Sequence, residues 1–74
     1  MEREYTIQLL PQPEGGYTVR VPAIPEVVTE GDTVEEALAM AREAIDLVLA
    51  SYRDHGWDIP EDVVPQTHQL TIAA

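Results

Sequence analysis

Residues 31–56 have the sequence GDTVEEALAMAREAIDLVLASYRDHG, which predicts one long amphipathic helix. Thr33 precedes Glu36 by three positions, the spacing of a capping box, in which the threonine hydroxyl accepts a hydrogen bond from the amide at the third helical position. Gly56 supplies a stop signal, because glycine adopts the left-handed conformation that ends many helices. We therefore expect a helix that begins after Thr33 and ends near His55.

The apolar residues of this stretch recur every three or four positions, which places them on one face of the helix. They are Val34, Ala37, Leu38, Ala41, Ala44, Ile45, Val48, Leu49 and Tyr52. An apolar face of this kind has to be buried, so the helix is expected to pack on a sheet. About 20 helical residues span roughly 30 Å, which is longer than any strand predicted here. One end of the helix should therefore extend past the sheet.

Alternation of apolar and polar residues predicts strands on both sides of the helix. We expect them over residues 4–10, 17–21 and 27–30, with a fourth over residues 67–72. The predicted fold is α+β with the order β-β-β-α-β: an antiparallel three-stranded meander plus one strand parallel to the first, with the helix on one face. A right-handed crossover then gives the sheet order 3-2-1-4.

The connection after the helix carries a large aromatic residue whose place is open between the core and an interface. Residues 57–66 contain two prolines and four apolar residues, which predicts an ordered connection and not a flexible linker. Trp57 begins this segment. We expect it in the core, because large aromatics dominate small cores as readily as they dominate interfaces.

Length and charge limit the possible functions. The 74 residues form one predicted domain, residues 1–74, with 14 Asp and Glu against 4 Arg and a net charge of −10. This charge disfavours nucleic acids and anionic membranes and favours a basic protein partner. The core is small and no cysteine can reinforce it, so a homodimer or higher homo-oligomer is expected. The amino terminus lacks the features of a signal peptide, which predicts a cytoplasmic protein.

The residues that most often carry chemistry do not form a catalytic constellation. Ser51 lies inside the helix without a neighbouring base, and a Ser nucleophile needs one. His55 and His68 are interpreted as a helix cap and a strand residue, since two ligands without a third make a poor metal site. Gly15-Gly16 precedes a strand, so it predicts a turn and not a phosphate cradle. We expect no enzymatic activity, no cofactor and no metal.

An ordered set of short motifs runs through residues 14–56. Gly15-Gly16-Tyr17 is followed by Val21-Pro22, Pro25, Gly31-Asp32-Thr33 and Glu35-Glu36-Ala37. This set resembles the amino-terminal domain of the HicB-type antitoxins. Many relatives add a carboxy-terminal DNA-binding domain, for which no room follows the fourth predicted strand. Many also have Gly-Cys where this chain has Glu26-Val27.

The resemblance implies a partial ribonuclease-H-like fold without its catalytic carboxylates. It also implies that the chain binds and neutralises a small basic HicA-type toxin, an mRNA-cleaving ribonuclease. The partner-binding surface is expected to comprise acidic residues around the third strand and along the helix. They are Glu26, Glu30, Asp32, Glu35, Glu36, Glu43 and Asp46.

Two other functions remain as alternatives. A solitary homo-oligomeric binding or structural protein of the same fold would have no toxin partner, and its genome would lack a small basic neighbour. A metal-dependent nuclease would need several carboxylates that point into the site from central strands. The inward positions of the first predicted strand are apolar instead, which argues against a nuclease.

Overall fold

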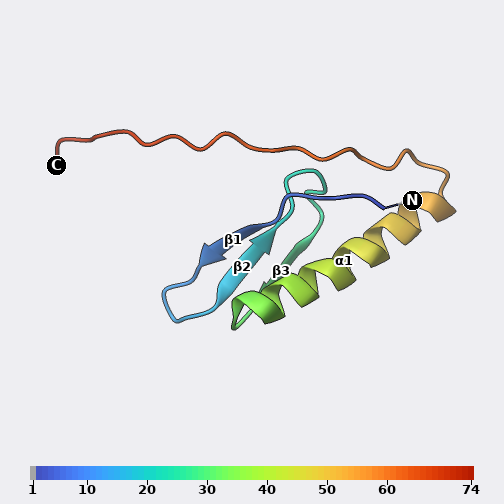
Figure 1. The fold of residues 1–74 in the computed structure, drawn as a ribbon, viewed down its shortest axis with the longest axis horizontal. Coiled ribbons are helices and arrows are strands. Elements are labelled where there is room, and N and C mark those ends of the chain that lie inside the picture. The colour runs from blue at the N-terminus through green and yellow to red at the C-terminus, as the bar shows by residue number, and fades with distance from the viewer. Residues whose placement is uncertain (1) are drawn as a thin grey trace.

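The computed structural model describes residues 2–74, which form three strands and one helix. Strands β1 (Gln8–Pro11), β2 (Tyr17–Arg20) and β3 (Val28–Gly31) make an antiparallel sheet in that order. Helix α1 (Val34–Asp54) runs beneath the sheet in Figure 1 and packs on one of its faces. The α+β class, the three-stranded meander and the helix that follows it are therefore confirmed.

The sheet register places alternate residues against the helix. Leu9 lies opposite Val19, and Val19 lies opposite Thr29, so these three positions share the face that α1 covers. Val19 is completely buried and packs with Ala37 and Ala41 of the helix. The small alanine side chains let the helix axis approach the sheet closely.

A second core cluster lies between the far end of the helix and the connector that joins β2 to β3. Val21, Ile24 and Val27 are buried there against Leu49. The connector folds back on itself through successive turns, with the Ile24 amide donating to the Val21 carbonyl and the Val27 amide donating to the Ile24 carbonyl. The prolines of this segment thus direct a tight path that brings three apolar side chains inward.

Both ends of α1 form as the sequence predicts. Thr33 has an extended backbone, with φ −126° and ψ 165°, and its hydroxyl accepts a hydrogen bond from the Glu36 amide at 3.1 Å. At the other end the His55 amide donates to the Ser51 carbonyl at 3.1 Å, and Gly56 follows with φ 70°. A residue with a side chain would be strained in that conformation, which explains the glycine.

The prediction that residues 67–72 form a fourth strand of this sheet is wrong. Among residues 2–74, only β2 pairs with β1, and residues 67–72 form no strand. They extend away from the domain as a single line of chain (Figure 1). The path is set earlier, because the Pro60 carbonyl accepts from the Tyr5 hydroxyl at 2.6 Å and Asp62 binds Thr6. These contacts hold the connection beside residues 5 and 6, where the predicted first strand begins, so β1 starts only at Gln8.

The expectation that Trp57 lies in the core is also wrong. Its side chain is 56% exposed. It stacks on the His55 ring, with ring centroids 4.4 Å apart, and meets Tyr52 edge to face. Trp57 follows the end of a helix that is longer than the strands, so there is no sheet beneath it to bury the indole.

Candidate partner interface

The seven acidic residues predicted to bind a partner are all exposed, but they do not form one surface. Glu26 lies near the carboxyl end of α1, where its carboxylate accepts a hydrogen bond from the Tyr52 hydroxyl. Glu35 lies in the first turn, 17 residues before Tyr52, which corresponds to about 25 Å along the helix. Glu26 is therefore remote from the acidic residues at the helix start.

The hydrogen bond between Tyr52 and Glu26 alters the titration of both groups. Donation from the hydroxyl stabilises the ionised carboxylate, which lowers the pKa of Glu26 below its usual range. The same bond favours the protonated phenol and raises the pKa of Tyr52. Glu26 thus stays ionised while it holds the connector before β3 against the last turns of the helix.

Glu30 belongs to a different face. The register of β2 and β3 places it opposite Thr18, one residue out of phase with the buried Val19. The Gln12 side-chain amide donates to Glu30 at 3.2 Å and to the Thr18 hydroxyl at 2.6 Å. This small polar network crosses the side of the sheet that the helix leaves uncovered.

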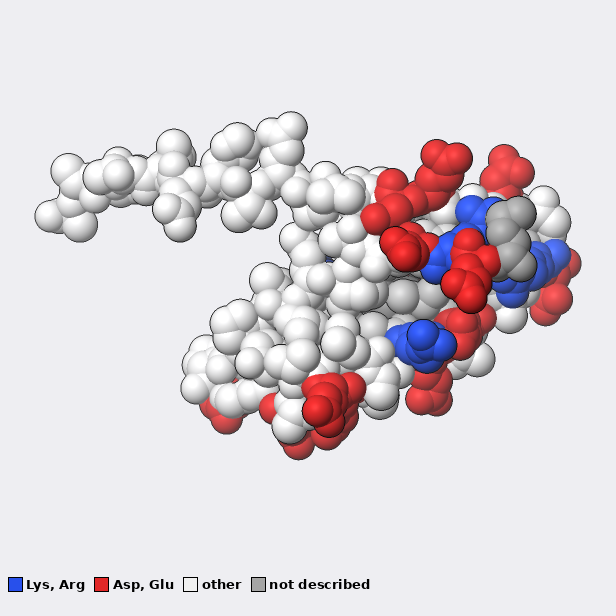
Figure 2. All heavy atoms as spheres, in the orientation of Figure 1, with Lys and Arg blue, Asp and Glu red and all other residues white. Residues whose placement is uncertain are grey.

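The remaining acids cluster on or beside α1. Asp32 precedes the helix, and Glu35 and Glu36 lie in its first turn, where negative charge is favoured by the helix dipole. Glu43 lies seven residues after Glu36 and so shares its outward face. Figure 2 shows acidic side chains gathered in separate groups on the visible face, one of them around the helix start.

Two large apolar residues lie on that outward face among the acids. Met40 and Leu47 are 39% and 68% exposed, and they alternate with Glu36 and Glu43 at spacings of three and four. Such a stripe combines apolar area with a charged border, which is the composition of many protein–protein contact surfaces. Neither residue is among those predicted to bind a partner, although their helical spacing relative to the acids is visible in the sequence.

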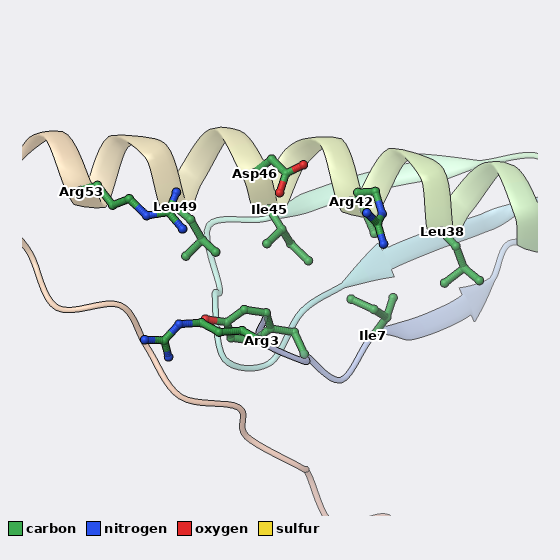
Figure 3. Close-up of a pocket in the computed structure, with 10 residues that line it drawn as sticks. Arg3, Ile7, Leu38, Arg42, Ile45, Asp46, Leu49 and Arg53 are labelled. Carbon is green, nitrogen blue, oxygen red and sulfur yellow. The ribbon is translucent and has the colours of Figure 1, made fainter. Parts of the chain in front are cut away.

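A groove opens along the neighbouring side of α1, between the helix and the amino-terminal segment. Its volume is about 430 Å³. Figure 3 shows Leu38, Ile45 and Leu49 directed from the helix toward the amino-terminal segment that carries Arg3 and Ile7. Three of the chain's four arginines and one acid also line the groove: Arg3, Arg42, Arg53 and Asp46.

The groove exists because the apolar stripe of the helix is wider than the sheet it packs on. Ala37, Ala41 and Leu49 are buried, whereas Val34 and Leu38 remain 46% and 45% exposed. The stripe of nine residues was predicted to be covered by a sheet of four strands. Within residues 2–74 the sheet ends at β1, so the side of the helix that carries Leu38 has no strand of this range beneath it.

The histidines and the serine have local structural partners in the described part of the chain. Across residues 2–74, no three His, Asp or Glu side chains are placed to hold a metal ion. His55 donates from Nδ1 to the Ser51 carbonyl at 2.8 Å, so the histidine and the only serine are joined as a helix cap. The one helix in the described range is also too polar to cross a bilayer.

These features define a small acidic α+β domain whose exposed surfaces are suited to binding another protein. Residues 5–70 match the family described as "HicB_like antitoxin of bacterial toxin-antitoxin system". The chain belongs to this family, in agreement with the resemblance found in its sequence motifs.

Individual relatives support the same assignment. The chain is 46% identical over 56 residues to Antitoxin HicB 1 of Photorhabdus laumondii, covering 76% of this chain and 36% of that protein. It is 49% identical over 41 residues to Antitoxin HicB of Escherichia coli K12, covering 55% and 30%. It thus spans about a third of the length of these antitoxins. The UPF0150 protein Ta0767 of Thermoplasma acidophilum matches end to end, with 39% identity over 96% of this chain and 99% of that protein.

Proposed function

We propose that this protein is an antitoxin that binds a small basic ribonuclease of the HicA type and neutralises it by covering its surface. The match of residues 5–70 to the antitoxin family carries the proposal. The net charge of −10 supports it, because an RNA-cleaving protein needs a cationic surface and an acidic partner can mask that surface.

The contact surface we propose is the outward stripe of α1 together with the acids at its start. Leu47 and Met40 supply apolar area that loses water on binding, and Glu36 and Glu43 border them. Apolar anchors at the centre of an interface contribute most of its affinity, while the surrounding charges steer encounter and reject wrong partners. Asp32 and Glu35 extend this surface at the helix start.

The other predicted acids have different roles in this proposal. Glu26 is engaged by Tyr52, and Glu30 lies on the sheet face opposite the helix. Asp46 lines the groove beside Arg42 and Arg53. These three residues add to the negative potential that attracts a basic protein over a distance of about 8 Å at physiological salt, but they lie outside the proposed contact.

The test is coexpression with any small basic protein encoded beside this chain, together with a measured affinity for the purified pair. The double variant Glu36→Lys/Glu43→Lys is expected to lose about tenfold or more in affinity and to fail to rescue growth. The matched control is Glu14→Lys/Glu61→Lys, which changes the net charge equally at two exposed positions away from the outward stripe. The control should bind within about twofold of the unchanged protein.

Two results would contradict the proposal. If the unchanged chain neither binds nor rescues cells from the neighbouring basic protein, the antitoxin role is wrong for this chain. If the two charge-reversal pairs weaken binding equally, overall charge and not the outward stripe determines the affinity.

A further inference from the structure

The carboxy-terminal segment forms an extended arm with no neighbours in the described part of its own chain. We define the arm as residues 66–74, all of which are exposed. Leu70 and Ile72 are 84% and 74% exposed, and they alternate with Gln69 and Thr71. This alternation is typical of a strand that buries one face, but here both apolar side chains are exposed to water.

The molecule is larger than a compact chain of its length. Its radius of gyration is 14.6 Å, against about 11 Å expected for a folded domain of this size. Its accessible surface is 5996 Å², against about 4,500 Å² expected from its mass. The excess of roughly 1,500 Å² in one chain is larger than the area of about 800 Å² that each partner buries in a specific interface of standard size.

The domain also presents a place that fits such a strand. Within residues 2–74 the outer edge of β1 has no paired strand. The Gln12 amide donates to the Gly16 carbonyl, so alternation along the strand turns the Gln8 and Leu10 amides toward β2 and leaves the Ile7 and Leu9 amides on the outer edge. The groove with Ile7, Leu38 and Ile45 runs beside this edge on the helix side. A strand added there would direct alternate side chains into the groove.

The arm does not reach its own groove. Asp62 and Pro60 fix the connection beside residues 5 and 6, and Pro65 then lies next to Leu10 and Val27 in a hollow shared with Gln8 and Arg20. Gln8, Leu10 and Arg20 belong to the sheet face opposite the helix, because they are out of phase with Val19. The arm therefore leaves on the far side of the sheet from the groove that its apolar residues fit.

We propose that two copies of this chain exchange arms, so that the arm of each adds a strand to the β1 edge of the other and places Leu70 and Ile72 in the other's groove. Addition of a strand to an exposed edge satisfies the backbone amides there, and exchange of identical segments is a common route to dimers. Each domain then gains the fourth strand that the sequence predicts, supplied by its partner.

Charge favours a second copy as the occupant. Residues 63–74 contain no Asp, Glu, Lys or Arg, and Figure 2 shows the arm without coloured side chains. Two chains that each carry −10 repel one another, and contact through an uncharged arm limits this repulsion. Arg3, Arg42 and Arg53 at the receiving groove reduce it further. The exchange goes beyond the proposed antitoxin function and requires no toxin.

The experiment measures the molar mass of the full chain in solution by light scattering, without any partner. We expect twice 8.2 kDa for the unchanged protein. The variant Leu70→Asp/Ile72→Asp should give the single-chain mass. The matched control Gln69→Asp/Thr71→Asp adds the same charge to the opposite face of the arm and should keep the doubled mass. The groove variant Leu38→Asp changes a residue that is already 45% exposed and should also give the single-chain mass.

Circular dichroism of each variant separates loss of exchange from loss of folding. The arm lies outside the core, so an arm variant that still folds should keep the helix signal of the unchanged protein. A single-chain mass for the unchanged protein would overturn the proposal. So would a doubled mass in Leu70→Asp/Ile72→Asp, or equal dissociation of the two arm variants. If the unchanged chain is a monomer and the arm variants lose only toxin binding, the arm belongs to the toxin contact and the exchange is wrong.

Discussion

Gly31 is a residue at which the end of β3 lies directly against the first turn of α1. A Cβ placed there would lie 2.5 Å from the Ala37 amide nitrogen and 2.7 Å from the Ala37 Cα, both of them backbone atoms. Backbone atoms of a capped helix cannot move aside as the end of a flexible side chain can. The glycine therefore determines how near the first turn of α1 lies to the end of β3.

The substitution Gly31→Ala is expected to destabilise the fold by about 1–3 kcal/mol, the cost of overpacking a close contact. Chemical unfolding of both proteins at one concentration measures the difference. Gly56→Ala is the comparison, because that position has open space around it and a φ of 70°, so only backbone strain opposes the change. Its expected cost is about 1 kcal/mol. An unchanged unfolding midpoint for Gly31→Ala would contradict this interpretation of the contact.

Single residues could be predicted from the sequence where a local rule decides them. Thr33 and Gly56 follow from capping chemistry, which depends on a few neighbouring residues. Trp57 could not be predicted in this way, since its exposure depends on where the sheet ends beneath the helix. Glu26 is similar, because its bond to Tyr52 joins positions 26 residues apart.

At the scale of elements, α1 presents three different faces. One packs on the sheet through Ala37 and Ala41, the next borders the groove through Leu38 and Arg42, and the third carries the outward stripe with Leu47. The sequence predicted the helix and its buried stripe, but assigned the whole stripe to the sheet. The covered part of the apolar stripe depends on the number of strands in the sheet. The spacing of apolar residues within the helix does not indicate that number.

Stability of the helix start is expected to depend on the Thr33 cap. The variant Thr33→Ala removes the acceptor for the Glu36 amide and should cost about 1 kcal/mol, which lowers the melting temperature by roughly 4–8 °C in a domain of this size. Thermal unfolding followed by circular dichroism measures the shift. Thr33→Ser keeps the hydroxyl and should stay near the unchanged value. If the alanine and serine variants melt together, the side-chain bond contributes nothing.

At the scale of the whole molecule, the candidate site depends on how the chain's two ends are joined. The sequence predicted strand character for residues 67–72, and the structure keeps them extended, but pairing within the chain was wrong. The reason lies at Tyr5 and Thr6, whose bonds to residues 60 and 62 direct the arm past the groove. Contacts more than 50 residues apart leave no periodic signal, so neither the arm's direction nor the groove could be inferred.

The bond between these ends should make the base of the arm sensitive to acid. The Asp62 carboxylate accepts from the Thr6 amide at 2.8 Å and from the Thr6 hydroxyl at 2.7 Å, and these two bonds lower the pKa of Asp62 from its usual 3.8. A carboxyl whose pKa is lower in the folded state contributes stability that is present above the unfolded pKa. This contribution is lost as the pH falls through the lower, folded pKa. Amide exchange at Thr6, measured by NMR, should therefore accelerate relative to amides within β2 as Asp62 becomes protonated.

Variants of both partners test whether this single pair is responsible. Thr6→Val removes the hydroxyl and keeps the amide, so the pKa of Asp62 should rise only part of the way to its usual value. Asp62→Asn carries no titrating group at this position, so the acid-dependent change at Thr6 should disappear while the rest of the sheet keeps its protection. Persistence of that change in Asp62→Asn would place its origin in another carboxyl group. The hydrogen bond from the Tyr5 hydroxyl to the Pro60 carbonyl would then be the contact that holds the connection.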